Sequence, residues 1–320
     1  MPLLQTVLGP IPAGNLGVTL PHEHVLCDFI GADKTSRRRW NLSEVVVTML
    51  PYLQQAQQRG ATAFVDCTPA YIGRDVRVLR RLAERTNLAL VTNTGYYGAA
   101  NDKFLPPHAF SETPDQLAAR WILEWERGID GTDVRPGFIK IGVDPATETP
   151  AGNGRPPRLS EVDAKLVRAA ARASKRTGLV VACHTVQGHA ALEEVRIFGE
   201  EGVPASRLIY VHADGEADPA FHRRVAEAGA WVEFDGIGSR PAEQHVRLVL
   251  PLLERHADRL LLSMDRGWYN AGEPGGGTIR PYTPLADEFL PLLRKAGVNE
   301  ATVRKLTVEN PARAFAIAGS

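Results

Sequence analysis

The sequence predicts an α/β protein whose strands and helices close a distorted (β/α)8 TIM barrel. Apolar runs alternate with amphipathic segments along the chain, and runs such as Leu179–Cys183 are almost continuously apolar, as in strands buried on both faces. The competing fold, a doubly wound open sheet, favours a G-x-G-x-x-G turn, which is absent. We therefore expect residues 1–320 to form one barrel domain.

Eight apolar runs predict the barrel strands, and amphipathic segments predict helices between several of them. The predicted strands are Val18–Leu26, Ala61–Pro69, Leu88–Tyr97, Gly137–Asp144, Leu179–Thr185, Leu208–Asp214, Ala230–Gly238 and Leu260–Asp265. The predicted helices are Val76–Arg85, Ser160–Thr177, Ala190–Glu201 and Asp218–Ala228. In a barrel of this kind, functional side chains lie at the C-terminal ends of the strands.

Composition excludes several classes of protein. The 320 residues are 44% hydrophobic and 23% charged, and 37 basic residues balance 37 acidic ones, which disfavours nucleic acid or an anionic membrane as a partner. No apolar run approaches the ~18 residues of a membrane span, and the N-terminus lacks the pattern of a secretory signal, so we expect a cytoplasmic protein. Cys27, Cys67 and Cys183 form no C-x-x-C pair and are expected to be buried free thiols.

Two histidines one residue apart, His22 and His24, close the first predicted strand. Alternate residues of a strand face the same side, so both imidazoles can bind one metal ion without distorting the backbone. Polar residues also occur near the ends of other predicted strands: Lys140, His184, His212 and Asp265.

Each of these residues has a structural alternative. A lone histidine can be a hydrogen-bonded core residue, a lysine can extend to the barrel mouth, and an aspartate can cap a helix. Six such residues on five strands at one end of a barrel favour a metal site, because unpaired polar groups are costly to bury.

Lys140 suggests how two metals could share this site. An ammonium group has no lone pair, but a desolvated amine beside cations can lose its proton and add carbon dioxide, which gives a carbamate with two oxygens. We predict that this N6-carboxylysine bridges two divalent cations. His22, His24 and Asp265 would hold the first, and His184 and His212 the second, with a hydroxide as the other bridge. The ligands suit zinc, and also iron, cobalt or manganese.

The sequence resembles the phosphotriesterase family of the amidohydrolase superfamily, which includes the phosphotriesterase-like lactonases. The matching segments span almost the whole chain in the family order: Gly17–His24, Gly137–Ile141, Cys183–Thr185, Val211–Asp214, Ser263–Asp265 and Glu309–Ala312. The resemblance implies a distorted barrel, a binuclear centre bridged by carboxylated Lys140, and a homodimer.

The expected substrate contacts are Tyr97, Gly236, Arg266 and Trp268. Tyr97 resembles a tyrosine that the lactonase branch places near the bridging hydroxide. Gly236 stands where that branch tends to carry an arginine and the phosphotriesterase proper a histidine, while Arg240 and Arg266 follow nearby. The loop from Arg266 to Tyr282 contains Trp268, expected as a pocket wall, and Gly275–Gly277, which is consistent with a mobile lid or with a flexible surface loop.

We expect hydrolysis of a lactone or related carboxylic ester of small size. The hydroxide attacks, Asp265 accepts the released proton, possible relay partners are His212 and Asp235, and Tyr97 polarises the carbonyl or positions the leaving group. Phosphotriester or phosphodiester hydrolysis is the alternative. A third hypothesis is a non-catalytic relative that binds ligands.

Overall fold

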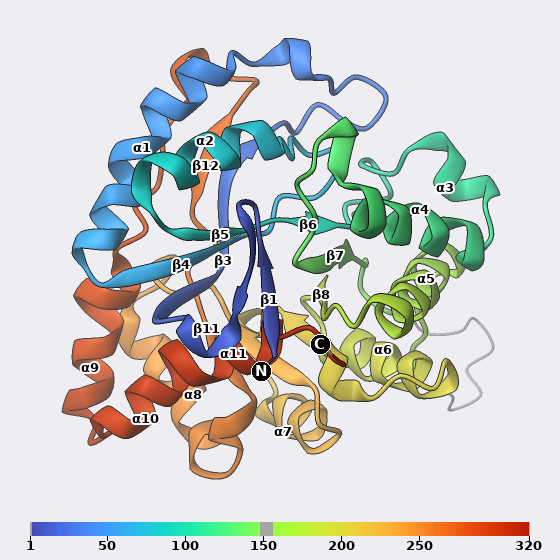
Figure 1. Ribbon diagram of the computed structural model, residues 1–320. Coiled ribbons are helices and arrows are strands. Elements are labelled where there is room, and N and C mark those ends of the chain that lie inside the picture. Colours follow the sequence, from blue (N-terminus) through green and yellow to red (C-terminus); the bar gives the residue numbers. More distant parts are fainter. Residues whose placement is uncertain (1, 148–155, 320) are drawn as a thin grey trace.

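The computed structural model describes residues 2–147 and 156–319. Strands lie at the centre and helices surround them (Figure 1). The strands are β1 (Leu3–Thr6), β2 (Gly9–Pro12), β3 (Val18–Cys27), β4 (Ala61–Asp66), β5 (Ala89–Val91), β6 (Asn93–Thr94), β7 (Phe138–Gly142), β8 (Val181–His184), β9 (Leu208–Val211), β10 (Trp231–Phe234), β11 (Leu260–Leu262) and β12 (Gly267–Asn270).

The barrel consists of parallel ladders that follow chain order. One sheet runs β12-β3-β4-β5 and the other β11-β10-β9-β8-β7-β6. The first and last barrel strands meet where the amide of Asp265 donates to the carbonyl of His22 at 3.1 Å, and where the Ser263 hydroxyl bonds to the His22 backbone. This structure confirms the predicted (β/α)8 barrel.

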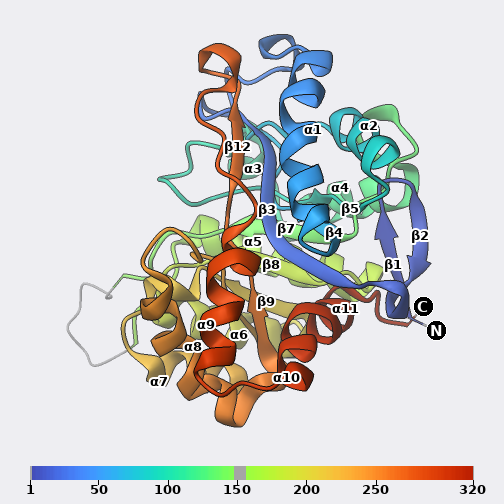
Figure 2. The same ribbon diagram turned by 90° about the vertical axis from the view of Figure 1, so that its left-hand side faces the viewer.

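The helices cover the outside of the barrel (Figures 1 and 2). They are α1 (Leu42–Gln58), α2 (Val76–Thr86), α3 (Pro107–Ser111), α4 (Pro114–Arg127), α5 (Glu161–Thr177), α6 (Gly188–Glu200), α7 (Pro219–Glu227), α8 (Ala242–His256), α9 (Leu290–Lys295), α10 (Glu300–Arg304) and α11 (Asn310–Phe315). The four predicted helices appear as α2, α5, α6 and α7. Asp75, Ser160 and Asp218 cap three of them by accepting backbone N–H bonds.

The antiparallel hairpin β1–β2 covers the end of the barrel where the strands begin. Figure 2 shows it beside both chain termini. Leu4 of the hairpin and Phe315 of α11 pack in one cluster with inward-facing residues such as Phe138 and Val180. The N-terminal end of the barrel is therefore filled with apolar side chains, and any polar site must lie at the other end.

Strand alternation determines which side chains enter the barrel. In β7, Phe138 belongs to the interior cluster, whereas Ile139 and Ile141 belong to the larger cluster between strands and helices. Lys140 therefore faces the interior with Phe138. At β8, Val180 and Ala182 belong to the interior cluster, so His184 faces the interior as well. In β10, Trp231 belongs to this cluster, so Glu233 and Asp235 also face the interior.

The predicted strand Val18–Leu26 appears as β3 and ends only one residue later than predicted, but His22 and His24 lie inside this strand and do not close it. β3 continues to Cys27, because β12 pairs with it in parallel: Gly267 lies opposite His24, and Asn270 opposite Cys27. The ladder between β3 and β4 shifts register between Leu20 and Glu23. The two histidines thus lie inside an extended strand that has partners on both sides.

The third predicted strand is divided into β5 and β6. β5 pairs with β4, whereas β6 pairs with β7. The Asn93 side-chain amide, at the division, donates to the carbonyls of Asp66 and Thr68, which fastens the chain to β4 where the backbone ladder has ended. The hairpin β1–β2, β12 and helices such as α1, α4 and α8 were not among the predicted elements.

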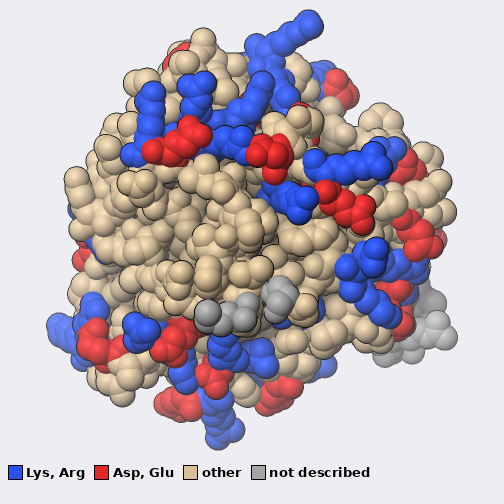
Figure 3. Space-filling view, viewed as in Figure 1, with Lys and Arg blue, Asp and Glu red and all other residues tan. Residues whose placement is uncertain are grey.

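The surface carries mixed charge. On the face in Figure 3, basic and acidic side chains adjoin one another around the edge, and the centre is mostly uncharged. Cys27, Cys67 and Cys183 are buried free thiols, as predicted. None of the described helices is both long enough and apolar enough to cross a membrane.

Candidate metal centre

The six predicted metal-ligating side chains meet in one cavity of about 110 Å³ at the C-terminal end of the barrel. His22 and His24 come from β3, Lys140 from β7 and His184 from β8. His212 directly follows β9, and Asp265 lies three residues after the end of β11. Apolar and aromatic residues complete the wall: Phe29, Cys67, Pro69, Ile72, Tyr97, Phe104 and Trp268.

His22, His24 and Asp265 form one group of potential metal ligands. Nε2 of His24 lies 3.0 Å from Oδ1 of Asp265, and Nε2 of His22 lies 3.7 Å from the same oxygen. Asp265 has φ of 50°, a left-handed conformation that turns its side chain toward the histidines three residues after β11 ends. On the other side of the His24 ring, Nδ1 bonds to the Thr68 hydroxyl at 2.8 Å.

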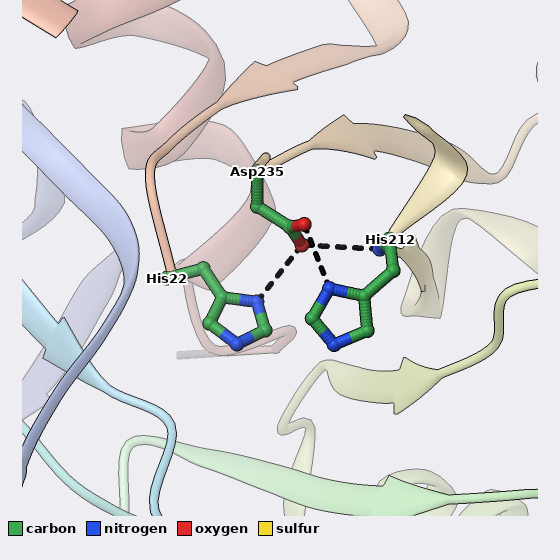
Figure 4. Close-up of side chains that lie close together, drawn as sticks. All are labelled: His22, His212 and Asp235. Carbon is green, nitrogen blue, oxygen red and sulfur yellow. Dashed lines mark hydrogen bonds and ion pairs between the residues drawn. The ribbon is translucent and has the colours of Figure 1, made fainter. Parts of the chain in front are cut away.

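Asp235 lies between His22 and His212 (Figure 4). Its Oδ1 is 2.7 Å from Nδ1 of His212, and its Oδ2 is 3.1 Å from Nδ1 of His22 and accepts the backbone amide of His212. Figure 4 shows both Nε2 atoms pointing away from Asp235, toward the same side. These three residues are close enough to form a second metal group, but the carboxylate already bonds to Nδ1 of both rings. Its role in this arrangement is to orient them.

Lys140 is almost fully buried, and its Nζ has no hydrogen-bond partner among the described residues. A buried ammonium without a partner is costly. His184 completes the cluster, with its ring centroid 4.4 Å from that of His212. Tyr97 packs its edge against His184 at 5.0 Å and covers Gly142, where a Cβ would come within 2.7 Å of the tyrosine ring.

The electrostatic environment keeps most of the histidines neutral. Burial lowers the pKa of His22 to about 4 and lowers the pKa of both His24 and His184. Burial also opposes the charged form of His212, but the charge and hydrogen bond of Asp235 outweigh it, so the pKa of His212 is raised. A neutral imidazole offers a lone pair, as a metal ligand must.

Both aspartates at the site are ionised. Although burial opposes ionisation of Asp265, its hydrogen bond to His24 and the neighbouring histidines lower its pKa. The pKa of Asp235 is likewise lowered, since His212 and His22 outweigh the effect of burial. The site therefore combines neutral imidazoles with carboxylates, which is the ligand chemistry of zinc and similar divalent cations. The unpartnered Lys140 amine also fits, because a carbamate there would supply two oxygens.

Glu23, between the two histidines, was not predicted as part of the site. Its Oε1 accepts from the Ser263 hydroxyl at 2.8 Å and the Met264 amide at 3.1 Å, and its Oε2 accepts from the Arg266 amide at 2.8 Å. These bonds hold the segment that carries Asp265. Burial raises the pKa of Glu23 to about 8.

Trp268 forms part of the cavity wall. Its indole ring stacks on His24 with centroids 3.8 Å apart, and its Nε1 donates to the Asp265 carbonyl at 2.8 Å. Trp268 itself belongs to β12, and a short 3-10 turn, Pro274–Gly276, follows this strand. Gly276 has φ of 85°, and a Cβ there would lie 2.3 Å from the Tyr269 ring. Close packing accounts for this glycine, and the mobile lid stays a prediction.

Gly236 and Arg266 lie at a second, larger cavity of about 480 Å³, which His212 and Asp265 also line. The amides of Asp235 and Gly236 both donate to Oδ2 of Asp214. Arg266 donates to the Gly238 carbonyl. The structure thus separates the predicted substrate contacts: Tyr97 and Trp268 border the histidines, whereas Gly236 and Arg266 border the adjoining cavity.

Sequence reasoning missed Glu23, Thr68, Glu233 and Arg280. Glu233 could have been found from strand alternation with Asp235, and it lies 3.2 Å from Nδ1 of His22. No local signal identifies Thr68 or Arg280, because each reaches the site through tertiary structure. Asp235 and His212, named as possible relay partners, are hydrogen bonded.

Comparisons with known proteins agree with the barrel fold and show the family of the chain. The chain is 30% identical over 331 residues to a phosphotriesterase homology protein of Mycobacterium tuberculosis, covering 98% of each chain. A mutant organophosphorus hydrolase from Deinococcus radiodurans has a TM-score of 0.84 at 29% identity, covering 98% of this chain and 97% of that one. A lactonase from Listeria monocytogenes has a TM-score of 0.80 at 26% identity, covering 98% and 99%. The phosphotriesterase family model matches residues 2–315, and the chain therefore belongs to the phosphotriesterase family.

Proposed function

We propose that this protein is a binuclear metal-dependent hydrolase that opens a lactone or a related carboxylic ester. The observation that carries the proposal is the convergence of four histidines, Asp265 and the unpartnered Lys140 amine on one cavity. Among the described residues, no hydrogen-bond partner stabilises the buried Lys140 amine at this position.

The residues divide into two sets of ligands. His22, His24 and Asp265 would hold one divalent cation, and His184 and His212 a second, with carboxylated Lys140 contributing an oxygen to each. When bound, the cations would polarise the ester carbonyl and lower the pKa of a water molecule. Zinc is our first choice because imidazole and carboxylate are its usual partners.

The chain's own residues would position the substrate and move the proton. Asp265 is ionised and would accept the proton released during attack. The buried Asp235 carboxylate would keep both attached imidazoles in the tautomer with Nδ1 protonated. Burial raises the pKa of Tyr97, so its hydroxyl stays protonated and can donate to the ester oxygen.

One contact favours lactone hydrolysis over phosphotriester hydrolysis: the Tyr97 ring packs against His184. By the family resemblance, members of the lactonase branch carry a tyrosine at this position. The similar solved structures include both a lactonase and an organophosphorus hydrolase, so phosphotriester turnover stays as the second candidate. We also propose a homodimer, from the family resemblance, and a cytoplasmic location, with which the buried free thiols Cys27, Cys67 and Cys183 are consistent.

The test is a steady-state comparison of γ- and δ-lactones of several chain lengths with paraoxon, on zinc-loaded protein. We expect kcat/KM for the best lactone to exceed that for paraoxon by at least about 100-fold, which is about 3 kcal/mol in transition-state binding. Asp265→Asn should abolish turnover of both substrates. Asp75→Asn, a buried helix-capping aspartate outside the pocket, serves as control and should retain turnover. A preference for paraoxon would favour the second candidate, and no turnover of any ester would support the ligand-binding hypothesis.

A further inference from the structure

One segment of the chain, residues 98–103, joins two aromatic side chains in the wall of the histidine cavity. Tyr97 precedes the segment and Phe104 follows it, and both line the cavity of about 110 Å³. Their ring centroids lie 5.9 Å apart in an edge-to-face arrangement. The conformation of this segment therefore decides where the two rings stand relative to the metal-ligating side chains.

The backbone of the segment is left-handed at three consecutive residues. Ala100, Asn101 and Asp102 have φ of 64°, 54° and 59°, in a region that residues with a Cβ rarely adopt. Every other non-glycine residue with positive φ in the part of the chain that the structure describes is isolated in the sequence. Such strain persists only where the surrounding structure holds it, and it is typical of functional sites.

Asp144 supplies the contacts that hold this left-handed turn. It lies two residues after the end of β7, the strand that carries Lys140. Its Oδ1 accepts the Ala100 amide at 2.9 Å, and its Oδ2 accepts the Asn101 amide at 2.9 Å. Consecutive backbone amides in a turn can form a concave site for an anion, and a carboxylate fills this one. One side chain thus binds two of the strained residues.

Backbone hydrogen bonds fix the two ends of the segment. The Gly98 amide donates to the Gly142 carbonyl at 2.9 Å, and the Ala32 amide donates to the Lys103 carbonyl at 3.1 Å. Between these two anchors, the described residues show no hydrogen bond from the segment to a distant part of the chain except those to Asp144. The middle of the turn therefore depends on this carboxylate.

Asp144 binds the turn even though two other carboxylates lie nearby. Burial raises the pKa of Asp163 to about 6, and the charges of Asp102 and Asp144 act in the same direction. These carboxylates do not form a cation site, because both groups of potential metal ligands among the described residues include His22. The bonds from the two amides compensate for the repulsion among these negative charges.

Phe104 transmits the position of the turn to the mouth of the cavity. Its ring meets Phe29 edge-on with centroids 6.4 Å apart, and Phe29 lies 5.4 Å from Trp268, which stacks on His24. Phe29 is 40% exposed, so these rings lie between the solvent and the histidines. A shift of the turn would move Phe104 and change the size of the cavity.

We propose that Asp144 is a positioning residue for the substrate. By binding the left-handed turn at residues 100–102, it fixes Tyr97 and Phe104 against the histidine cavity and limits the size of the ester that enters. The inference rests on the proposed ester hydrolysis and names a residue that helps to select its substrate. Asp144 lines neither cavity, so it acts through the turn and does not contact the substrate.

The kinetic test compares γ-butyrolactone with γ-decalactone, which carries a long alkyl chain, on zinc-loaded protein. Asp144→Ala should raise KM for γ-butyrolactone about tenfold and lower kcat less than about threefold, because the wall is no longer fixed. The ratio of kcat/KM for γ-decalactone to that for γ-butyrolactone should rise about tenfold. Asp144→Asn, which keeps one acceptor, should give intermediate values. The control Asp218→Ala removes a carboxylate from a backbone amide of α7, outside both cavities, and should change neither value.

Glycine substitutions in the turn should reverse the effect of Asp144→Ala. Glycine adopts left-handed angles without strain, so Ala100→Gly with Asn101→Gly in the Asp144→Ala background should return KM to within about threefold of the wild type. A carboxylate with another role would not be replaced by glycines at the residues that it binds. Failure of the two glycines to lower KM would show that Asp144 does not act through the turn.

Fluorine NMR separates failure of the positioning role from failure of the proposed reaction. In protein labelled with 4-fluorophenylalanine, the Phe104 resonance is identified by its loss in Phe104→Leu. This resonance should shift or broaden in Asp144→Ala, return in the variant with both glycines, and stay unchanged in Asp218→Ala. If no lactone turns over but these changes appear, the positioning role stands and the reaction is wrong. An unchanged Phe104 resonance in Asp144→Ala would overturn the positioning role.

Discussion

The two sides of the pocket differ in how their side chains are held. On the histidine side (His22, His24, His184 and His212), three of the four rings have a hydrogen-bonded partner behind Nδ1, and those partners are buried. On the arginine side (Arg240, Arg266 and Arg280), two guanidinium groups have one backbone carbonyl each as partner, and Arg240 and Arg280 are exposed.

The two sides of the pocket therefore meet two different requirements, holding cations and selecting a substrate. Groups that hold cations need fixed directions, which buried partners provide at the cost of desolvation. Groups that select a substrate can sit on loops, where substitution disturbs the fold little. Variants of the first kind should therefore affect stability and metal binding, and those of the second kind should affect only the choice of substrate.

The largest effect is expected at Glu23. Glu23→Ala removes the acceptor for three donors on the segment that carries Asp265, and leaving buried donors unpaired should lower the free energy of unfolding by about 4 kcal/mol. Urea denaturation measures this. Glu23→Gln keeps one acceptor and should recover part of the loss. A change below about 1 kcal/mol in Glu23→Ala would show that the histidine side is not held as described.

The free energy of unfolding should depend on pH through Glu194, a buried residue of α6 that accepts a hydrogen bond from Thr185, just after β8. Burial raises its pKa to about 8, and the charge of Asp163 acts in the same direction. The hydrogen bonds of Glu194 with Thr185 and Cys183 act in the opposite direction. The folded state binds the Glu194 proton more tightly than the unfolded state. The contribution of this proton to the free energy of unfolding is therefore complete below about pH 4.5 and is lost as pH rises toward 8.

The predicted loss from Glu194 between pH 5.5 and 7.5 is about 3 kcal/mol. Glu194→Gln, which cannot ionise, should remove that part of the pH dependence, and chemical denaturation of both proteins at the two pH values measures the difference. Identical slopes in the wild type and the variant would contradict the raised pKa.

Asp235→Asn should weaken metal affinity and kcat by about 10- to 100-fold, because the amide cannot accept from both imidazoles as the carboxylate does. Competition with a chelator measures the affinity. Asp75→Asn again serves as the matched buried control, and it should lower stability without changing the metal affinity. Equal metal affinity in both variants would remove the proposed orienting role.

The smallest effect is expected on the arginine side. Arg240→Gln should change the free energy of unfolding by less than about 0.5 kcal/mol, because the side chain is exposed and has no carboxylate partner among the described residues. Arg74→Gln is the contrast, since it leaves the half-buried Glu124 without its two-pronged partner. A loss for Arg240→Gln as large as that for Arg74→Gln in thermal denaturation would show that the arginine side is not loosely held.

Residues in strands were predictable, and residues joined by tertiary structure were not. The alternation of Phe138, Lys140 and their neighbours places the lysine in the barrel once β7 is recognised. The same rule places His184. By contrast, β12 is short and pairs with β3 after more than 200 intervening residues, so nothing local predicts β12 or its pairing with β3.

The larger cavity, which Arg240, Arg266 and Arg280 line, shows the same limit. Arg240 and Arg266 were visible as candidates, but their direction depends on the Gly238 and Asp214 carbonyls, which only the folded loops bring near. Arg280 enters through an antiparallel bridge with Gly267. Loop geometry of this kind depends on packing with distant segments and leaves no periodic pattern in the sequence.

The most direct test of the central claim is the metal content per chain of the wild type and of Lys140→Ala, purified side by side with zinc and bicarbonate and measured by elemental analysis after dialysis. The account predicts close to two zinc ions per chain in the wild type and one or fewer in Lys140→Ala, with lactonase activity lost in parallel. Two ions retained by Lys140→Ala with full activity, or one or fewer in the wild type, would contradict it.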